Sequence, residues 1–396
     1  MTIFAAILAV LGGVLVLGWT TRHAVIYREL HNSNILSESY PVDESLAPLV
    51  SVIVAAKDEQ DNIRACLESL VAQEYSNYEI IVVNDRSSDE TGIIIDQLAD
   101  DHEIITALHV EHLPDEWMGK NHAMQQAANV AKGEYLLLTD ADCIHRSTKA
   151  LSVSMQYIKD KQVGLVSVLP NLDCKTVWES MIQPICSGVM MIWFDPKKVN
   201  NPKRKNAYAN GAFMLFEREA YDKIGQHEVI KNCMQEDMEL GKLAKHSGVG
   251  LSVIRNDNLY TVRMYKQFSD LIQGWTRIFY GSFPTYKRGL LSLIAIVFMG
   301  ILPHLVWITG LVGLMQGASY DSWYTVALIT GGIAGILQQT AIYRFYRILK
   351  LNPFLCWTYP FSSFLVSYIL VRAMSKLRPG AKVTWKGTSY KHKKSS

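Results

Sequence analysis

The sequence predicts an α/β domain carried between membrane-spanning helices, on three observations. Of the 396 residues, 49% are hydrophobic and only 19% are charged, whereas a soluble protein carries about a quarter charged residues. Uncharged apolar stretches long enough for a membrane stand near both ends of the chain. Between them, short β-branched runs alternate with amphipathic segments. That alternation is typical of an α/β fold with a doubly wound, Rossmann-like sheet of parallel strands.

Residues 1–21 are the first predicted membrane element, an N-terminal anchor. They contain no charged side chain, whereas Arg22 and Arg28 follow them. A cleaved signal peptide is the alternative, but it would carry basic residues before the apolar run. The positive-inside rule therefore predicts an N-terminus outside the cell and a cytosolic position for the domain that follows. Residues 22–47, rich in Ser, Asn and Pro towards their end, are predicted to be a linker.

A second membrane domain is predicted at residues 289–371. It consists of a hairpin and a third apolar segment, and a basic tail follows it: 289–315 with 322–343, then 351–371, then 372–396. Pro353 and Pro360 interrupt the third segment. A full crossing would put the tail, which has eight Lys and Arg and no acid, outside the cell. We therefore expect a re-entrant or interfacial segment that keeps the tail in the cytosol.

The net charge of +2 averages over two unlike parts of the chain. After Asp321, the last 75 residues hold eleven of the 39 Lys and Arg and no acidic residue, so the preceding part is net acidic. Because the surplus of positive charge lies at the apolar end, a nucleic-acid partner is disfavoured. The six cysteines show no CxxC pair and are interpreted as reduced thiols of a cytosol-facing protein.

The polar block at 48–287 has the size of one large domain. Its β-branched runs predict four strands, at 50–55, 79–83, 104–110 and 135–138. Asp61 is expected to cap the helix after the first strand. The apolar segment from Val177 to Lys198 has two interpretations that stay open. It forms either an interfacial entrance for a substrate or a core helix packed on the sheet.

Acidic residues gather where the predicted strands end, which is where ligands bind in such sheets. Lys57, Asp58 and Glu59 follow the first strand, Asp85 the second, and Asp140 and Asp142 the fourth. A single Asp there is often a turn or cap residue. Asp140 and Asp142, two residues apart in an extended segment, project to the same side. Such a like-charge pair requires a cation, and carboxylate oxygens suit Mg2+ or Mn2+.

Five segments of this block resemble the family 2 glycosyltransferases, which have a GT-A fold. They are SVIVAAKDE, IIVVNDRSSDET, GEYLLLTDADC, NGAFMLFERE and QEDMELG. The resemblance implies that Asp85 contacts the uracil or ribose of a UDP-sugar. It also implies that Asp140 and Asp142 hold a metal on the diphosphate and that Asp237 is the catalytic base. Lys57 and Glu59 fall on the donor side, although many members have Arg where Lys57 stands. A helix cap is the alternative role for Asp237.

Three shorter motifs look like the hopanoid-associated and carotenoid (diaponeurosporenoate) glycosyltransferases, a branch close to the ceramide glucosyltransferases. They are Trp-Met-Gly-Lys at 117–120, Gly-Trp-Thr-Arg at 274–277 and Trp-Lys-Gly at 385–387. This similarity implies a lipid acceptor and a bacterial cell membrane. Lys120 and Arg277 are candidates for the donor diphosphate. Glu236, Trp275, Trp385 and Lys386 are candidates for the acceptor or diphosphate region.

Each of these candidates has a plainer alternative. Lys120 at a helix start could simply be solvated. Trp275 and Trp385 could be interfacial anchors, since Trp favours the membrane boundary. Lys386 could belong to a lipid-facing charge patch.

The expected function is an inverting, metal-dependent transfer of a sugar to a membrane lipid. UDP-glucose is the expected donor, and the acceptor is expected to be a hopanoid, a carotenoid, a sphingolipid or a glycerolipid. One alternative is a processive polysaccharide synthase. Such enzymes carry Gln-x-x-Arg-Trp, whereas Gln273 is followed here by Gly-Trp-Thr-Arg. The other is an inactive membrane scaffold, which the intact Asp85, Asp140, Asp142 and Asp237 disfavour.

Overall fold

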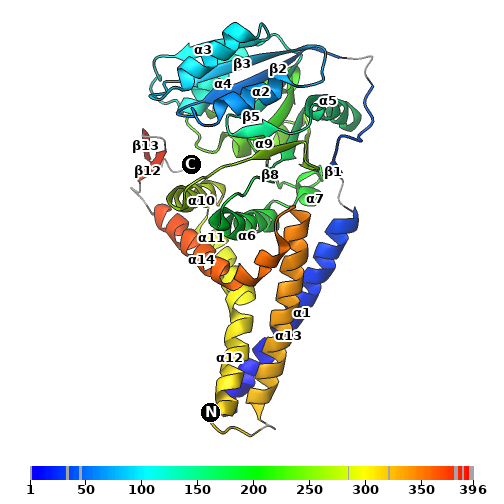
Figure 1. Ribbon diagram of the computed structural model, residues 1–396, viewed down its shortest axis with the longest axis vertical. Coiled ribbons are helices and arrows are strands. Elements are labelled where there is room, and N and C mark those ends of the chain that lie inside the picture. The colour runs from blue at the N-terminus through cyan, green and yellow to red at the C-terminus, as the bar shows by residue number, and fades with distance from the viewer. Residues whose placement is uncertain are drawn as a thin grey trace.

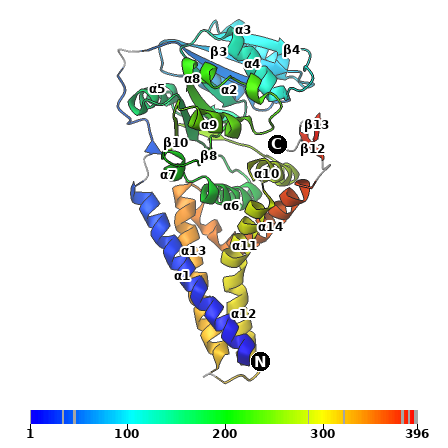
Figure 2. The ribbon, with the colours of Figure 1, turned by 180° about the vertical axis from the view of Figure 1, so that it is seen from behind.

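The computed structural model describes residues 2–32, 35–43, 47–283, 285–319, 322–378, 382–385 and 388–391. An α/β domain lies at one end of the elongated molecule, and α1 (Thr2–Asn32), α12 (Leu302–Met315) and α13 (Trp323–Ile348) run out at the other (Figure 1). A layer of shorter helices lies between these two parts in both views (Figures 1 and 2). The predicted combination of an α/β domain with apolar helices from both ends of the chain is confirmed.

The central sheet has eight strands. Their spatial order is β1 (Ile35–Leu36), β10 (Leu251–Asn256), β7 (Leu165–Leu169), β9 (Phe213–Glu217), β5 (Tyr135–Asp140), β2 (Val50–Ala56), β3 (Tyr78–Asp85) and β4 (Ile105–Val110). The four strands predicted from sequence correspond to β2, β3, β4 and β5. Ile53 of β2 pairs with Ile81 on one side and Leu138 on the other.

The four predicted strands, β2, β3, β4 and β5, are parallel as expected, but the sheet as a whole is mixed because it also contains β9, a strand that was not predicted. β9 runs antiparallel to both β5 and β7, while the other neighbouring strands are parallel. The first residue of β9, Phe213, pairs with Thr139 near the carboxyl end of β5. The chain thus enters β9 at the edge where β5 ends, and it can only run back in the opposite direction. This return brings the segment before β9 to the ligand-binding edge of the sheet.

Helices cover both faces of the sheet, as the continuous apolar strands require. Ile53 packs in one core with α4 (Gly119–Val130) and α9 (Glu236–His246). Val52 and Val54 point into a second core with α2 (Ile63–Val71), α3 (Thr91–Asp101) and α5 (Ala150–Lys161). The remaining short elements are β6 (Cys143–His145), β8 (Asn171–Leu172), α7 (Pro196–Val199), α8 (Arg218–Lys223), η1 (Glu228–Ile230) and β11 (Tyr260–Val262).

Asp61 does not cap α2, contrary to the prediction. The N-cap residue is Asn62, and the amides of Asn62 and Ile63 both donate to the carbonyl oxygen of Glu59 at 2.9 Å. The carbonyl oxygen of Glu59 therefore already accepts hydrogen bonds from the two amides at the start of α2. Asp61 accepts instead from Nζ of Lys266 at 3.0 Å.

Four segments are long and apolar enough to cross a membrane: Ile3–Glu29, Tyr286–Met315, Trp323–Ile348 and Pro353–Lys376. They belong to α1 (Thr2–Asn32), to α11 (Tyr286–Ile296), η2 (Val297–Ile301) and α12 (Leu302–Met315), to α13 (Trp323–Ile348), and to η3 (Pro353–Thr358) and α14 (Tyr359–Lys376). α1 continues through residues 22–32, which were predicted to be linker.

The last of these segments takes a path of its own. α1, α12 and α13 run alongside one another, whereas α14 lies obliquely across the upper end of this bundle (Figures 1 and 2). After α14, the strands β12 (Lys382–Trp385) and β13 (Thr388–Lys391) lie on the same side of this helix as the α/β domain (Figure 1). An interfacial segment would follow such a path, and the course predicted for residues 351–371 stays a prediction.

α6 (Val177–Trp193) and α10 (Phe268–Ser282) form the layer between the sheet and the membrane helices (Figure 1). α6 begins with a capping box between Thr176 and Glu179. Its buried side packs into the core, while Val177, Trp178 and Ile192 are 45–60% exposed. Both interpretations of this segment therefore apply in part, since the helix packs beneath the domain and also presents apolar side chains outward.

Candidate active site

Two neighbouring cavities lie at the carboxyl ends of β2, β3 and β5. The larger one has a volume of about 570 Å3, and the smaller one has a volume of about 180 Å3. The larger cavity is lined by ten charged residues: Lys57, Glu59, Asp85, Lys120, Asp140, Asp142, Asp270, Arg277, Arg372 and Lys376. The smaller cavity contains Glu236 and Asp237, and it shares Lys120, Asp140, Asp142 and Arg277 with the larger one. Nine of the predicted site residues thus come together.

Asp85 lies at the end of β3 and is 3% exposed. Its Oδ1 accepts a hydrogen bond from Nε of Arg86 at 2.8 Å. Its Oδ2 faces the first residue of α4, Gly119, where an added Cβ would lie only 2.4 Å away. The glycine of the Trp-Met-Gly-Lys motif is therefore required for space, because any larger residue would displace this carboxylate. A helix N-terminus also favours the negative charge beside it.

Lys120 forms a bridge between two carboxylates. Its Nζ lies 2.6 Å from Oδ1 of Asp140 and 2.5 Å from Oε1 of Glu236, and its side chain is 19% exposed. Burial alone would lower the pKa of Lys120, but the two carboxylates raise it well above its usual value. The alternative of a solvated lysine at a helix start is wrong. Lys120 keeps its charge and joins the end of β5 to the start of α9.

Asp140 and Asp142 suit a hard divalent cation. Both line the larger cavity, and the Asp140 side chain is 32% exposed. Among the described residues, no group of three or more His, Cys, Asp or Glu side chains converges on one point. Two carboxylates would leave most positions around the ion to water and to ligand oxygens, which is how Mg2+ is usually bound beside phosphates. The residues therefore fit the predicted metal.

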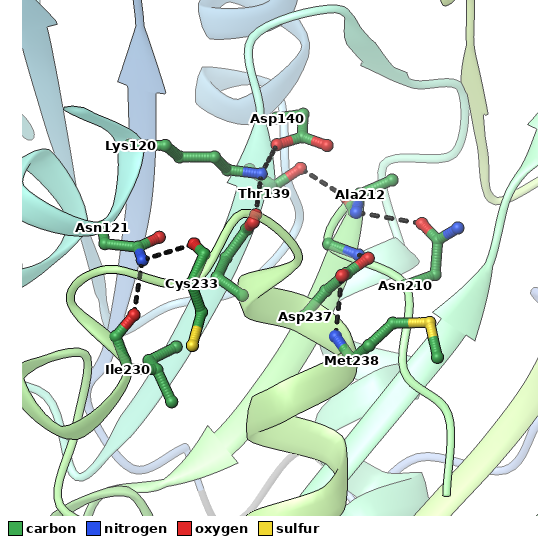
Figure 3. A network of polar contacts seen from close by, with 12 residues as sticks. Lys120, Asn121, Thr139, Asp140, Asn210, Ala212, Ile230, Cys233, Asp237 and Met238 are labelled. Atoms are coloured by element: carbon green, nitrogen blue, oxygen red, sulfur yellow. Dashed lines mark hydrogen bonds and ion pairs between the residues drawn. The ribbon is translucent and has the colours of Figure 1, made fainter. Parts of the chain in front are cut away.

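Asp237 lies at the second position of α9, and two backbone amides hold its carboxylate (Figure 3). Gly211 N–H donates to Oδ2 at 3.1 Å and Met238 N–H donates to Oδ1 at 2.7 Å. Burial and the Glu236 carboxylate raise the pKa of Asp237 to about 7, against the opposing effect of Lys120. A carboxyl with this pKa can accept a proton near neutral pH, as a general base must.

Asn121 is a residue of the site that sequence reasoning did not assign. It is 1% exposed, and its Nδ2 donates to the carbonyl oxygens of Ile230, Lys231 and Cys233 at 2.8–3.2 Å. Figure 3 shows the bonds to Ile230 and Cys233. These carbonyls belong to the loop that leads to Glu236. The sequence contained one signal for this role. Asn121 directly follows Gly119 and Lys120, and both of those residues also contact the site.

A second group of hydrogen bonds holds the segment before β9 (Figure 3). Oγ1 of Thr139 donates to the carbonyl oxygen of Ala212 at 2.8 Å, and the amide of Ala212 donates to Oδ1 of Asn210 at 3.0 Å. Because Gly211 also donates to Asp237, β5 and α9 are connected through three consecutive residues. The spacing between the proposed metal ligand Asp140 and Asp237 is fixed by these contacts.

Arg277 projects from α10 and lines both cavities. Its charge opposes the rise that burial causes in the pKa of Tyr265. The Tyr265 ring lies so close to Gly274 that an added Cβ would be 2.1 Å from its Cζ. Trp275 behaves differently from the prediction. It is 4% exposed and packs in the core against Phe279, and the described walls of both cavities are formed without it. Neither a substrate contact nor an interfacial anchor applies to Trp275.

Lys57 and Glu59 lie in the loop after β2 and line the larger cavity. Asp58 between them has φ of 51°, and its Oδ1 accepts from the amide of Ser88 at 2.8 Å. The amide of Glu59 donates to Oγ1 of Thr91 at 2.8 Å. These bonds join the loops after β2 and β3. Asp58 therefore has the structural role of a turn residue, which was the alternative for a single Asp at a strand end.

The two candidates near the C-terminus cannot be placed in the site. Trp385 is the last residue of β12, and its side-chain position is not among the described features. Lys386 lies outside the described residues.

Comparison with known proteins supports the fold and the class of this domain. Residues 51–225 match the family model described as Glycosyl transferase family 2. The chain also resembles a mannosyltransferase from Pyrobaculum calidifontis, solved with GDP-Man and Mn2+. The TM-score is 0.52 at 16% identity, over 93% of this chain and 98% of that one. The GT-A fold is therefore confirmed, and residues 51–225 are similar to the family 2 glycosyltransferases.

Two curated relatives show how far the sequence similarity extends. A beta-monoglucosyldiacylglycerol synthase from Trichormus variabilis is 32% identical over 165 residues, which are 40% of this chain and 33% of that protein. A poly-beta-1,6-N-acetyl-D-glucosamine synthase from Staphylococcus epidermidis is 26% identical over 183 residues, 44% of this chain and 41% of that protein. The chain spans less than half the length of the curated relatives it matches.

Proposed function

We propose that this protein transfers a sugar from a nucleotide-sugar donor to a lipid in the same membrane, with inversion at the anomeric carbon. The observation that carries the proposal is the pair of cavities at the strand ends. One presents Asp85, Asp140 and Asp142 to a donor, and the other presents Asp237 to an acceptor. They share Lys120 and Arg277, so the two substrates would meet beside two cations.

The larger cavity suits a nucleoside diphosphate. Asp85, held by Arg86 and by the tight contact with Gly119, would accept hydrogen bonds from the base or the ribose. Arg277 supplies the planar cation that binds phosphate oxygens best. Asp140 and Asp142 would hold Mg2+ or Mn2+, which when bound neutralises charge on the diphosphate leaving group. UDP-glucose is the donor to test first.

The transfer itself needs one base. As the acceptor hydroxyl oxygen bonds to the anomeric carbon, the bond from that carbon to the diphosphate oxygen breaks and the hydroxyl proton moves to the Asp237 carboxylate. A single displacement of this kind inverts the anomeric configuration. The two amides from Gly211 and Met238 keep the carboxylate oriented.

A lipid acceptor is supported by the surroundings of Asp237. The smaller cavity is bordered by apolar side chains that include Met190 of α6 and Ile278 of α10, and these two helices lie against the membrane helices (Figure 2). A hydroxyl group of a lipid could reach the base from this side while its chains stay in the bilayer. One curated relative is named for making a glucosylated diacylglycerol.

The proposed location is the cytosolic face of a bacterial cell membrane. Arg22 and Arg28 of α1 and Arg344 and Arg347 of α13 lie at the helix ends nearer the α/β domain. The positive-inside rule therefore supports a cytosolic domain.

Incubation of membranes with labelled UDP-glucose and a total lipid extract tests the proposal. We expect a labelled lipid whose mass has increased by one hexose, and formation of this product should require a divalent cation. Asp142→Ala should abolish the metal-dependent product, and Asp237→Asn should abolish turnover while UDP still binds. Asp96→Asn, an exposed carboxylate paired with His109, is the matched control and should stay active. An active Asp237→Asn protein would refute the base assignment.

The same experiment separates the two alternatives. A processive synthase, as one curated relative is named, would give a polymer instead of a singly glycosylated lipid. A scaffold on an inactive transferase domain would give no product with any lipid extract.

A further inference from the structure

The last helix, α14, contributes two cations to the larger cavity. Its 18 residues include two charged side chains, Arg372 and Lys376, and both line the cavity beside Arg277. The two are four residues apart, so they lie on the same face of the helix, one turn from each other. Both residues lie far beyond residues 51–225, the part that matches the family model.

The position of these cations is fixed by packing. Ala373 and Met374, which stand between them, are 3% and 6% exposed. A Cβ added at Gly289 of α11 would meet Met374 Cγ at 2.7 Å, so the two helices are in close contact. The guanidinium of Arg372 lies 5.7 Å from the centre of the Tyr368 ring. The next cation along the chain, Arg378, is exposed and does not appear in the described cavity walls.

The charges of the larger cavity divide between two walls. The strand ends and their loops supply four acids, Glu59, Asp85, Asp140 and Asp142, and one cation, Lys57. Lys120 is already engaged by Asp140 and Glu236. The helices α10 and α14 supply three cations, Arg277, Arg372 and Lys376, and one acid, Asp270, so this wall is net positive. A nucleoside diphosphate carries two to three negative charges on adjacent phosphates, so it would be favoured next to the helical wall.

We infer that Arg372 and Lys376 bind the diphosphate of the nucleotide-sugar donor, together with Arg277. This inference rests on the donor class proposed above and makes α14 part of the donor site. Donor binding and the packing of α14 against α10 and α11 would then stabilise each other. A phosphate bound by Arg372 and Lys376 would also hold α14 in place.

Binding of UDP and of UMP to the full-length protein tests the inference. The variants are Arg372→Gln, Lys376→Gln and both together, with Arg378→Gln as the matched control and Arg372→Lys as the conservative variant. Affinities are measured by calorimetry at constant Mn2+ in phosphatidylcholine nanodiscs and in phosphatidylglycerol nanodiscs. We expect Arg372→Gln and Lys376→Gln each to bind UDP about tenfold more weakly. The affinity for UMP should fall by a smaller factor. The control should bind normally, and Arg372→Lys should recover part of the affinity.

Three results would overturn the inference. The first is an unchanged ratio of UDP to UMP affinity in the double variant, with its melting temperature also unchanged. The second is a double variant that keeps its affinity for UDP but binds phosphatidylglycerol more weakly. That result would assign Arg372 and Lys376 to a lipid headgroup. The third is an unsubstituted protein that binds neither UDP nor GDP. Of the three results, only this one would also refute the proposed donor class.

Discussion

Replacing Lys120 by Met should destabilise the protein markedly in the absence of metal. The substitution keeps the size of the side chain but leaves the carboxylates of Asp140 and Glu236 without the cation that lies 2.6 and 2.5 Å from them. Breaking a buried ion pair from one side typically destabilises by about 3–5 kcal/mol. The side chains of Lys120, Asp140 and Glu236 are 19%, 32% and 13% exposed, and water therefore screens part of this interaction. We expect about 3 kcal/mol.

Thermal unfolding in detergent, with EDTA present, measures this effect. A loss of about 3 kcal/mol corresponds to a melting temperature lowered by about 6 °C or more in a domain of this size. Mn2+ should restore more of the melting temperature in Lys120→Met than in the unsubstituted protein, because a cation on Asp140 replaces the missing charge. The control is Lys242→Met, which breaks the exposed Lys242–Glu239 pair and should cost less than about 1 kcal/mol. Equal shifts for the two variants would refute the reasoning.

Three other expectations concern the same site. Since Asp237 must be deprotonated to act as a base and its pKa is about 7, kcat/KM should rise about tenfold per pH unit below pH 7 and level off above it. A pH–rate profile with its midpoint below pH 5 would contradict this. Gly119→Ala should weaken UDP binding at least about tenfold, because the new Cβ would displace the Asp85 carboxylate. Gly13→Ala, where nothing lies within 4 Å of the added atom, should bind UDP normally. Asn121→Asp removes the two N–H donors that three carbonyl oxygens share, and it should lower stability by about 3 kcal/mol. A melting temperature like that of Asn129→Asp, at an exposed position, would show that these bonds do not hold the loop.

Local features of the fold could be predicted because single segments of sequence determine them. The run from Val50 to Ala55 is apolar at nearly every position and is buried on both faces of the sheet, which left few alternatives to a central strand. The acids that follow such strands meet at one edge by the geometry of parallel strands. For this reason Asp85, Asp140 and Asp142 could be grouped correctly although they are far apart in sequence.

Features that depend on chain direction or on distant partners could not be predicted. The five residues of β9 are compatible with either direction in the sheet, and its antiparallel course follows from where the chain returns. The charge of Lys120 was recognisable, but its second partner, Glu236, is brought close only by the tertiary fold. Trp275 stands next to glycine in a helix of mixed composition, and its burial depends on which face meets the core.

Pairing of β1 with β10 has a consequence for how the protein would meet its acceptor. α1 ends at Asn32, and Ile35 and Leu36 already pair with Arg255 and Asn256 at the edge of the sheet. If α1 crosses a bilayer, as its length and composition allow, this pairing would hold the α/β domain at a set height above that bilayer. The lipid acceptor proposed above would reach a site held in this way by lateral diffusion in two dimensions. The rate of encounter would depend on the mole fraction of the acceptor among the surrounding lipids, and its concentration in the bulk solution would have little influence.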